Sequence, residues 1–343
     1  MNKYKKVYFI ADISANHDGD IDRAKNLCLL AKKSGADAAK FQHFKAETIV
    51  NDYGFKSLGG KQSHQANWSK SVYEVYKDAS VPIDWTPILK EYCNNIGIDF
   101  FTTPYDLDYV DIIDQYVDMY KIGSGDITWI DMLEKISLKK KKVLLATGAS
   151  NISDVQIAID TIKKFNSDIV LMQCNTNYTA SDDNFKFINL NVLKLFSVLY
   201  PEIELGLSDH TLGDETVLGA VALGAKYIEK HFTDDNNRIG PDHPFSMNPK
   251  TWKKMVERTR RLEMSLGSPN KKIENNEMET AILQRRSYRL TRDLSDGQII
   301  KKSDVIALRP CPKDAYPLNQ NIIGKRLNKD KKLNDYIKFN DFQ

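Results

Sequence analysis

Two histidines stand in short segments of similar composition, His210 in GLSDHT and His231 in IEKHFT. Each follows an apolar run, and so does Asp12 near the start of the chain, in VYFIADISANHDG. Two imidazoles and one carboxylate suit a divalent metal ion, which can act as a Lewis acid on a carbonyl group. A single histidine is more often a hydrogen-bonded structural residue, so a structural role for each histidine is the alternative.

Two lysines indicate a second kind of chemistry. Lys40 lies in AAKFQ and Lys121 in YKIGSGD, each within an apolar run. Lysine supplies a point charge, and hydroxyl groups and glycine-flanked amides supply directed hydrogen-bond donors. Together with Thr103, Ser124 and Ser208, the lysines predict a site for a small dianion such as a phosphate ester. The alternative is that each lysine covers apolar surface and keeps its ammonium group in solvent.

The elements that must position these residues recur regularly along the chain. Short apolar runs bounded by turn signals predict strands at 7–13, 38–44, 99–104, 119–123, 143–147, 169–174, 204–209 and 226–232. Amphipathic stretches with helical spacing lie between them, for example 21–34 and 151–165. This alternation predicts a (β/α)₈ barrel (TIM barrel), whose active sites form at the carboxyl ends of the strands. The alternative, a doubly wound open sheet, usually has a glycine-rich nucleotide loop, and this chain has no GxGxxG or Walker A sequence.

Composition and charge restrict the class of protein. The 343 residues are 41% hydrophobic and 28% charged, which is typical of a soluble globular protein. No apolar run approaches the ~18 residues of a membrane span, and the N-terminus lacks a signal-peptide pattern. The four cysteines show no paired spacing, which favours reduced thiols. We therefore expect a cytoplasmic protein that does not bind a membrane.

The pattern changes after the eighth predicted strand. We expect a catalytic barrel at 1–265, a polar linker at 266–284 and a small β-rich domain at 285–343. The small domain holds 14 Lys and Arg against 7 Asp and Glu. It has no RNA-binding signature, so we interpret its positive charge as help in binding an anionic substrate and expect no nucleic-acid partner.

Several motifs resemble those of a known family, the bacterial sialic acid (nonulosonate) synthases. These motifs are ADISANHDG, AAKFQ, FFTTPYD, YKIGSGD, LATGAS, GLSDH and VALGAKYIEKHFTDD. The similarity extends over nearly the whole chain, and the C-terminal segment resembles the antifreeze-like (SAF) domain of that family. The resemblance implies condensation of phosphoenolpyruvate with an N-acetylated hexosamine, foremost N-acetylmannosamine to give N-acetylneuraminate, with C–O cleavage and release of phosphate. Legionaminate and pseudaminate synthases, which use 2,4-diacetamido-trideoxyhexoses, are alternatives within the same resemblance.

The resemblance also implies roles for individual residues. His210 and His231 match metal ligands, with Mn²⁺ as the implied ion and Mg²⁺ or Co²⁺ as alternatives. The positions that match catalytic residues are Asp12, Asp126 and His231. The positions that match phosphoenolpyruvate-binding residues are Lys40, Thr103, Lys121, Ser124, Thr147, Thr176 and Ser208. The positions that match sugar-contacting residues are Asn67, Tyr178, Asp242 and Arg309.

Arg309, in ALRPC, matches an arginine that the SAF domain of one subunit inserts into the barrel of the other. The resemblance therefore implies a homodimer as well as the two small-molecule substrates. The sequence departs from the family pattern at four positions, which puts the acceptor sugar in question more than the reaction type. Aspartate replaces glutamate at Asp12 and Asp126, Ala146 replaces a serine, and Thr176 replaces an asparagine.

Two other function classes fit the same residues. A Schiff-base aldolase would use Lys40 or Lys121 as the nucleophile and would need that lysine desolvated, with a low pKa. A non-catalytic sugar- or phosphate-binding barrel is supported only by the four departures, and retention of both histidines and both lysines disfavours it.

Overall fold

A computed structural model describes residues 6–58, 65 and 68–342 of the chain. The chain divides into two compact units, Met1–Gly267 and Ser268–Gln343. The stretch at 266–284, expected to be a linker, contains the short 3₁₀ turn Asn275–Glu277 and the helix α12 (Met278–Gln284).

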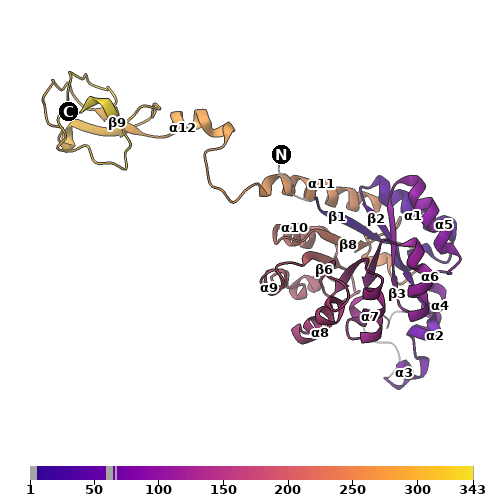
Figure 1. The fold of residues 1–343 in the computed structure, drawn as a ribbon. Coiled ribbons are helices and arrows are strands. Elements are labelled where there is room, and N and C mark those ends of the chain that lie inside the picture. The colour runs from indigo at the N-terminus through magenta and orange to yellow at the C-terminus, as the bar shows by residue number, and fades with distance from the viewer. Residues whose placement is uncertain (1–5, 59–64, 66–67, 343) are drawn as a thin grey trace. The chain divides into compact units, whose positions relative to one another are not determined.

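The first unit is a closed barrel of parallel strands (Figure 1). Its strands are β1 (Tyr8–Asp12), β2 (Ala38–His43), β3 (Asp99–Pro104), β4 (Met119–Ile122), β5 (Lys142–Ala146), β6 (Ile169–Cys174), β7 (Glu204–Asp209) and β8 (Tyr227–His231). They pair in sequence order, and β8 closes the ring on β1 with Asp12 opposite His231. The predicted (β/α)₈ barrel is confirmed.

Helices surround the barrel and connect its strands. They are α1 (Ile21–Lys33), α2 (Ala46–Ile49), α3 (Asp52–Ser57), α4 (Val72–Ala79), α5 (Trp85–Ile96), α6 (Leu107–Ile113), α7 (Ile130–Leu138), α8 (Ile152–Lys163), α9 (Val192–Leu199), α10 (Glu215–Ala222) and α11 (Pro249–Leu266). Side-chain caps determine where several of them begin. The Asp20 carboxylate accepts hydrogen bonds from the first turn of α1, and the Asn151 side chain does the same for α8. The amphipathic stretches at 21–34 and 151–165 therefore form helices within one or two residues of the predicted bounds.

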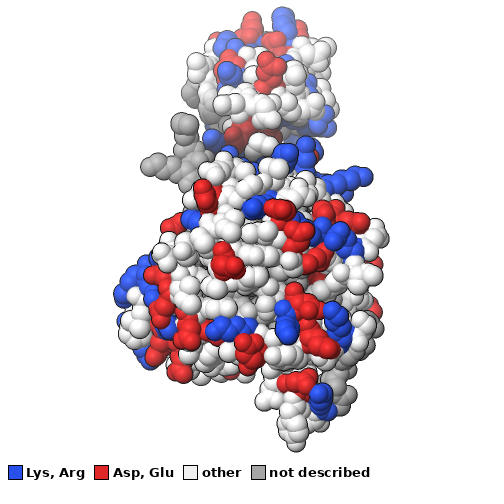
Figure 2. Space-filling model, turned by 90° about the vertical axis from the view of Figure 1, so that its right-hand side faces the viewer, with Lys and Arg blue, Asp and Glu red and all other residues white. Residues whose placement is uncertain are grey.

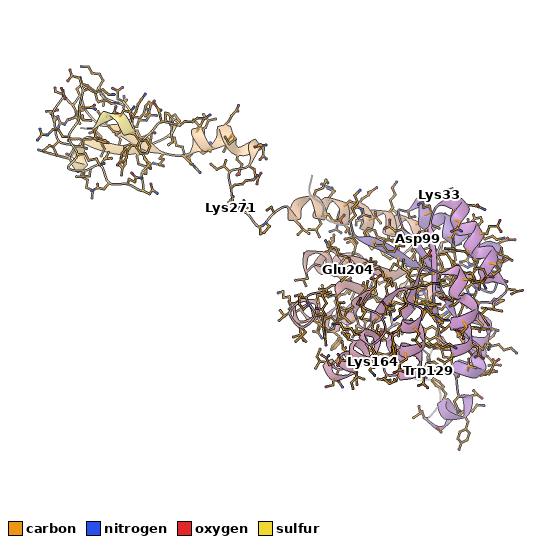
Figure 3. The ribbon with its side chains drawn as sticks, in the orientation of Figure 1. Lys33, Asp99, Trp129, Lys164, Glu204 and Lys271 are labelled. Carbon is orange, nitrogen blue, oxygen red and sulfur yellow. The ribbon has the colours of Figure 1, made fainter. Side chains whose placement is uncertain are left out.

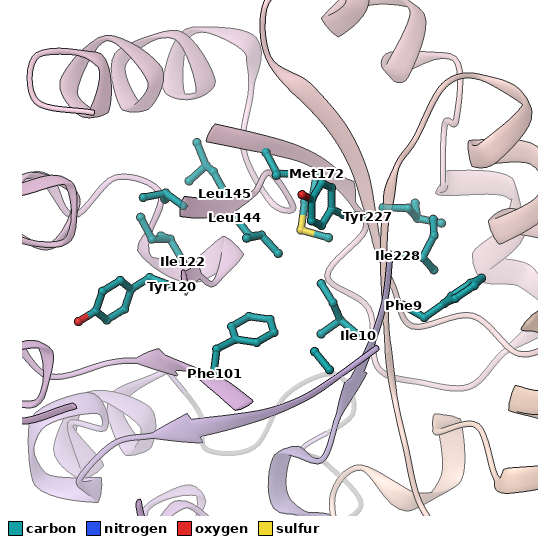
Figure 4. Close-up of a cluster of buried hydrophobic side chains, with 14 of the residues drawn as sticks. Phe9, Ile10, Phe101, Tyr120, Ile122, Leu144, Leu145, Met172, Tyr227 and Ile228 are labelled. Carbon is teal, nitrogen blue, oxygen red and sulfur yellow. The ribbon is translucent and has the colours of Figure 1, made fainter. Parts of the chain in front are cut away.

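The interior of the barrel is a packed apolar core. Alternate residues of a strand point to opposite faces, so Ile10 and Asp12 face the barrel axis while Phe9 packs against the outer helices. Figure 4 shows part of the buried hydrophobic cluster, which includes Ile10, Phe101 and Met172 together with the outward-facing Phe9. Asp99 and Glu204, labelled in Figure 3, begin β3 and β7 and so mark the amino end of the barrel. The inward-facing residues of the strands are apolar in the middle of the barrel and polar towards the carboxyl ends of the strands. The polar side chains therefore gather at that end of the barrel.

The second unit is a small β-rich domain with its own core. Strands β9 (Ser287–Leu290) and β10 (Val305–Leu308) pair antiparallel. The core residues are Leu290, Leu294, Ile300, Tyr316, Ile322, Leu327 and Ile337. The backbone groups of Leu294 and Lys331 exchange two hydrogen bonds of 2.9 and 2.8 Å, so segments distant in the sequence lie side by side here.

The face of the molecule in Figure 2 carries Lys and Arg interspersed with Asp and Glu over both units. Ion pairs form among the charged side chains of the described residues, for example between Lys139 and Asp111 at 2.6 Å. Among the described residues, no helix combines the length and the apolar character that crossing a membrane requires.

Candidate active site

A cavity of about 360 Å³ lies at the carboxyl ends of the barrel strands. It gathers most of the residues that the sequence predicted for the site. These are Asp12, Lys40, Thr103, Lys121, Ser124, Asp126, Thr176, Tyr178, Ser208, His210, His231 and Asp242. They converge because the strands are parallel, so that every strand delivers its last inward-facing residues to the same end of the barrel.

Of the predicted residues in the described part of the first unit, only Thr147 is not among those that line this cavity. Thr147 follows β5, but its hydroxyl donates a 3.0 Å hydrogen bond to the carbonyl of Met172 on the neighbouring strand. Arg309 lies in the second unit and is exposed. Asn67 falls outside the described residues. The contact of Thr147 with phosphoenolpyruvate stays a prediction.

The floor of the cavity is a buried network of ion pairs. The Lys40 Nζ atom lies 2.8 Å from Asp12 Oδ2, and the Lys121 Nζ atom lies 2.6 Å from Glu229 Oε1. Burial disfavours the charged form of Asp12, but the positive groups around it, Lys40 foremost, together outweigh burial and lower the pKa of Asp12 to about 2. Burial likewise opposes the charge on Lys40, and Asp12 and then Glu229 overcome it and raise the pKa of Lys40. Both members of this pair therefore stay charged.

Glu229 is a cavity residue to which the sequence analysis assigned no role. It connects the two lysines, because its Oε1 atom also lies 4.0 Å from Lys40 Nζ and accepts a 3.1 Å hydrogen bond from Ser208. Burial opposes its ionisation, but Lys121 and then Lys40 lower its pKa. The available signal was strand alternation: Glu229 precedes His231 by two positions, so both side chains face the barrel interior.

Hydroxyl groups lie around the two lysines, and the backbone of Gly148 approaches two of them, those of Ser124 and Thr176. Lys40 donates a 3.1 Å hydrogen bond to Thr103 Oγ1, and the Ser124 hydroxyl accepts a 2.9 Å hydrogen bond from the backbone amide of Gly148. A Cβ atom on Gly148 would lie 1.9 Å from the Oγ1 atom of Thr176, so only glycine fits there. Ammonium, hydroxyl and amide groups thus meet at one side of the cavity, as an anionic ligand requires.

The two histidines occupy another part of the cavity wall. Their ring centroids are 5.3 Å apart, and His231 Nε2 lies 3.6 Å from Asp12 Oδ2. The Nδ1 atom of His210 contacts the carbonyl of Asn175 at 3.0 Å, which orients that ring. The Nδ1 atom of His231 lies 3.7 Å from Asp242 Oδ2 and has no hydrogen-bond partner among the described residues.

The groups around the two histidines are of kinds that bind divalent cations. Burial lowers the pKa of His231 and keeps its imidazole neutral, as a metal ligand must be. At His210 burial acts in the same direction, but Cys174 outweighs it and raises the pKa of that imidazole. The cavity lining also holds four carboxyl groups, of Asp12, Asp126, Glu229 and Asp242, against the two ammonium groups of Lys40 and Lys121, a negative excess that a cation would offset. Among the described residues, no three His, Cys, Asp or Glu side chains form a complete ligand group, so water or substrate oxygen atoms would supply the rest.

Asp126 stands apart from the ion pairs. It ends the short 3₁₀ turn Ser124–Asp126 that follows β4, and it lines the cavity. Burial raises the pKa of Asp126 to about 6. A carboxyl group that titrates near neutral pH inside a cavity is suited to general acid–base catalysis.

The lysine environments argue against a Schiff-base aldolase. Such an enzyme needs a neutral amine at working pH. The pKa of Lys40 is raised, and Lys121 is held in an ion pair of 2.6 Å with Glu229. Both ammonium groups are therefore better suited to binding an anion than to attacking a carbonyl.

Comparison with known proteins agrees with this geometry. Residues 27–271 match the model of the NeuB family, and residues 285–343 match that of the SAF domain. The N,N'-diacetyllegionaminic acid synthase of Legionella pneumophila is 39% identical, with 93% of this chain and 90% of that protein covered. The pseudaminic acid synthase of Campylobacter jejuni serotype O:2 is 31% identical, with 100% and 98% covered. A crystal structure of the sialic acid synthetase of Leptospira borgpetersenii superposes with a TM-score of 0.71 at 29% identity and covers 80% of this chain and 90% of that one.

The region that matches the NeuB model contains both lysines and both histidines of the cavity. The similar proteins named above are synthases of legionaminic, pseudaminic and sialic acids, which are nonulosonates. The chain therefore belongs to the NeuB family of nonulosonate synthases and carries a C-terminal SAF domain.

Proposed function

We propose that this enzyme condenses phosphoenolpyruvate with an unphosphorylated N-acylated hexosamine, with C–O cleavage and release of inorganic phosphate. One observation carries the proposal: a single cavity of about 360 Å³ is lined by two ammonium and two imidazole groups. The ammonium groups suit the carboxylate and phosphate of the enol. The imidazoles suit a cation, Mn²⁺ in the first instance, which when bound would polarise the aldehyde carbonyl.

The reaction assigns a task to each group. The C3 atom of phosphoenolpyruvate forms a bond to the aldehyde carbon, whose oxygen takes up a proton. Water then adds at C2, and phosphate leaves with its bridging oxygen. Lys40 and Lys121 hold the anionic groups of the enol, and the ionised carboxylate of Asp126 accepts the proton of the attacking water.

An adjoining outer cavity supports an acceptor without phosphate. Its volume is about 900 Å³, and it shares Tyr178 and Trp68 with the inner cavity. The two cations among its described lining residues are already paired, Arg238 with Asp18 at 2.7 Å and Lys70 with Asp78 at 2.5 Å. Its remaining lining includes the apolar residues Ala15, Ala79, Val75, Ile239, Pro241 and Pro244. A neutral sugar with apolar substituents suits such a cavity better than a sugar phosphate.

The direct test is a screen of acceptors with phosphoenolpyruvate and Mn²⁺, read by phosphate release and by mass spectrometry of the product. The acceptors are N-acetylmannosamine, its 6-phosphate and the 2,4-diacetamido-trideoxyhexoses that lead to legionaminate and pseudaminate. We expect a nine-carbon 2-keto acid with at least one neutral acceptor and EDTA-sensitive release of phosphate. A borohydride-trapped lysine adduct with pyruvate, without phosphate release, would establish the aldolase instead.

Asp126→Asn is expected to abolish the pH dependence near pH 6 that the Asp126 carboxyl group gives to stability and to activity. Because burial raises the folded-state pKa of Asp126 above its ordinary value, ionisation of this carboxyl group destabilises the fold as pH rises through about 6. The asparagine variant should exceed the parent in free energy of unfolding by about 2 kcal/mol at pH 8 and match it at pH 3.5. Denaturant unfolding at both pH values measures this difference. A stability difference that does not change with pH would contradict the assignment.

The same carboxyl group should control the pH dependence of the rate. The kcat/KM of the parent should rise through pH 6, whereas the variant should be slow and should lack that rise.

Arg309→Ala is expected to lower activity. Mixing it with a variant whose barrel site is inactive is expected to restore part of that activity. If the SAF domain of one subunit completes the barrel site of another, mixing Arg309→Ala with His231→Ala creates heterodimers with one intact site. Refolding the two together in equal amounts should recover roughly a quarter of the parental activity. Each variant refolded alone is the control, and activity no higher than their average would count against a shared site.

A further inference from the structure

Tyr105 forms part of the wall of the inner cavity, and the proposed reaction assigns it no task. It follows the last residue of β3, and its backbone amide donates a 2.9 Å hydrogen bond to the carbonyl of His43. Its ring lies edge-on to Phe44, with centroids 6.1 Å apart, and Phe44 in turn packs against Tyr76 at 5.5 Å. Tyr105, Phe44 and Tyr76 all line the inner cavity and form an aromatic wall from three different segments of the chain.

The phenol oxygen of Tyr105 lies directly over Gly123. A Cβ atom on Gly123 would approach that oxygen to 2.7 Å and two ring carbons to 3.2 Å. The backbone of Gly123 has φ −67° and ψ 154°, a conformation that any residue adopts. The glycine is therefore explained by space and not by backbone geometry: it leaves room for the phenol next to the Ser124–Asp126 turn.

The phenol and the carboxyl group beside it have unused hydrogen-bonding capacity. Within the part of the chain that the structure describes, no group is hydrogen-bonded to the Tyr105 hydroxyl or to the Asp126 side chain. Burial, and then the charge of Asp126, raise the pKa of Tyr105 well above its ordinary value, so the phenol keeps its proton and can donate. Polar groups of this kind in the wall of a cavity are the usual means of orienting a ligand.

We propose that the Tyr105 hydroxyl donates a hydrogen bond to the acceptor sugar and helps to determine which acceptor is used. This inference rests on the proposed function. The anionic substrate has its own partners in Lys40 and Lys121, which carry charge. The aromatic wall of Tyr105, Phe44 and Tyr76 offers apolar ring faces with a neutral donor, which suits an uncharged sugar with a few polar substituents.

The first experiment is steady-state kinetics of Tyr105→Phe with each acceptor that the parent accepts. Loss of one neutral hydrogen bond should raise KM for the acceptor by roughly 3- to 10-fold, with KM for phosphoenolpyruvate within twofold of the parent. The change should be largest for the acceptor whose substituent meets the phenol, so the ratio of kcat/KM between acceptors should also change. Tyr92→Phe is the matched control, because Tyr92 lies on α5, packs against the barrel core and is absent from the cavity lining.

The second experiment moves the phenol without removing it. In Gly123→Ala the new methyl group must displace the Tyr105 ring, so KM for the acceptor should rise at least as much as in Tyr105→Phe. In a Tyr105→Ala background the same glycine substitution should have less than a twofold further effect, because nothing remains to be displaced.

An unchanged KM for the acceptor in Tyr105→Phe overturns the inference. An equal rise in KM for phosphoenolpyruvate also overturns it, because the phenol would then act on phosphoenolpyruvate and not on the sugar alone. Absence of phosphate release by the parent with every acceptor would overturn the proposed function separately. In that event calorimetry with N-acetylmannosamine decides the role of Tyr105. Weaker binding to Tyr105→Phe than to the parent supports it, and equal or undetectable binding to both refutes it.

Discussion

His231→Ala is expected to lower turnover at least roughly 10³-fold while the protein stays folded. The imidazole is buried at the carboxyl end of β8, 3.6 Å from Asp12, and faces His210 across 5.3 Å. Its removal takes away one of two imidazoles that could hold a cation beside the aldehyde. The fold should survive because the Nδ1 atom of His231 has no hydrogen-bond partner among the described residues, and Asp12 keeps its contacts with Lys40 and Gln42.

Three measurements check this prediction: phosphate release, Mn²⁺ affinity by calorimetry and thermal unfolding. His43→Ala is the matched control, since His43 is also buried but its two ring nitrogens contact Thr102 and Thr86 at 2.7 and 2.9 Å, and it is not among the described residues that line the cavity. That variant should be less stable than the parent and yet retain metal affinity. Full activity of His231→Ala would remove the metal assignment.

Lys121→Met is expected to impair both catalysis and stability. The ammonium group lies 2.6 Å from Glu229 Oε1, and both side chains are at least 95% buried. Removing one member of such a buried ion pair leaves an unpaired charge and typically destabilises a protein by about 3–5 kcal/mol. Loss of a charge that holds phosphoenolpyruvate should lower kcat/KM for this substrate by roughly 10²-fold or more. Thermal unfolding and initial rates at varied phosphoenolpyruvate concentration measure the two effects.

Two further variants separate the two effects of Lys121. The double variant Lys121→Met/Glu229→Leu should regain most of the lost stability, since neither charge remains, but not the activity. Lys230→Met breaks another buried ion pair, with Asp209 at 2.5 Å, on the outer side of β8. It should destabilise the protein to a similar degree and leave KM for phosphoenolpyruvate unchanged. If Lys230→Met and Lys121→Met impaired catalysis equally, the role of Lys121 in binding the anion would be refuted.

Much of the barrel could be predicted because its signals are local. A strand such as Ile169–Cys174 is a short apolar run between turn residues, and α8 begins at Ile152, directly after Asn151, whose side chain caps the helix within three residues. Such patterns depend on neighbours in the sequence, so they can be read without coordinates. The four residues His210, His231, Lys40 and Lys121 could be assigned to one site for the same reason. Each lies in a strand or directly follows one, and parallel strands of a barrel share one carboxyl end.

Other features of the site depend on contacts between distant segments. Thr147 stands at a strand end like the others, yet its hydroxyl is bonded to Met172 on the next strand. Tyr105 and Gly123 fit together although one follows β3 and the other β4. No local pattern reports the direction of a side chain after the last residue of a strand, because that direction depends on the packing of the neighbouring loop.

The sequence by itself determined the eightfold alternation of strand and helix and the types of chemical group at the strand ends, because periodicity and residue type are properties of adjacent positions. Only the tertiary structure decided which of these groups are paired. Closure of β8 on β1 places Asp12 opposite His231, and the interior of the ring brings Glu229 to Lys121 across 108 positions of sequence. Charges buried in a barrel interior must find partners across it, and those partners are chosen by the geometry of the ring and not by proximity along the chain.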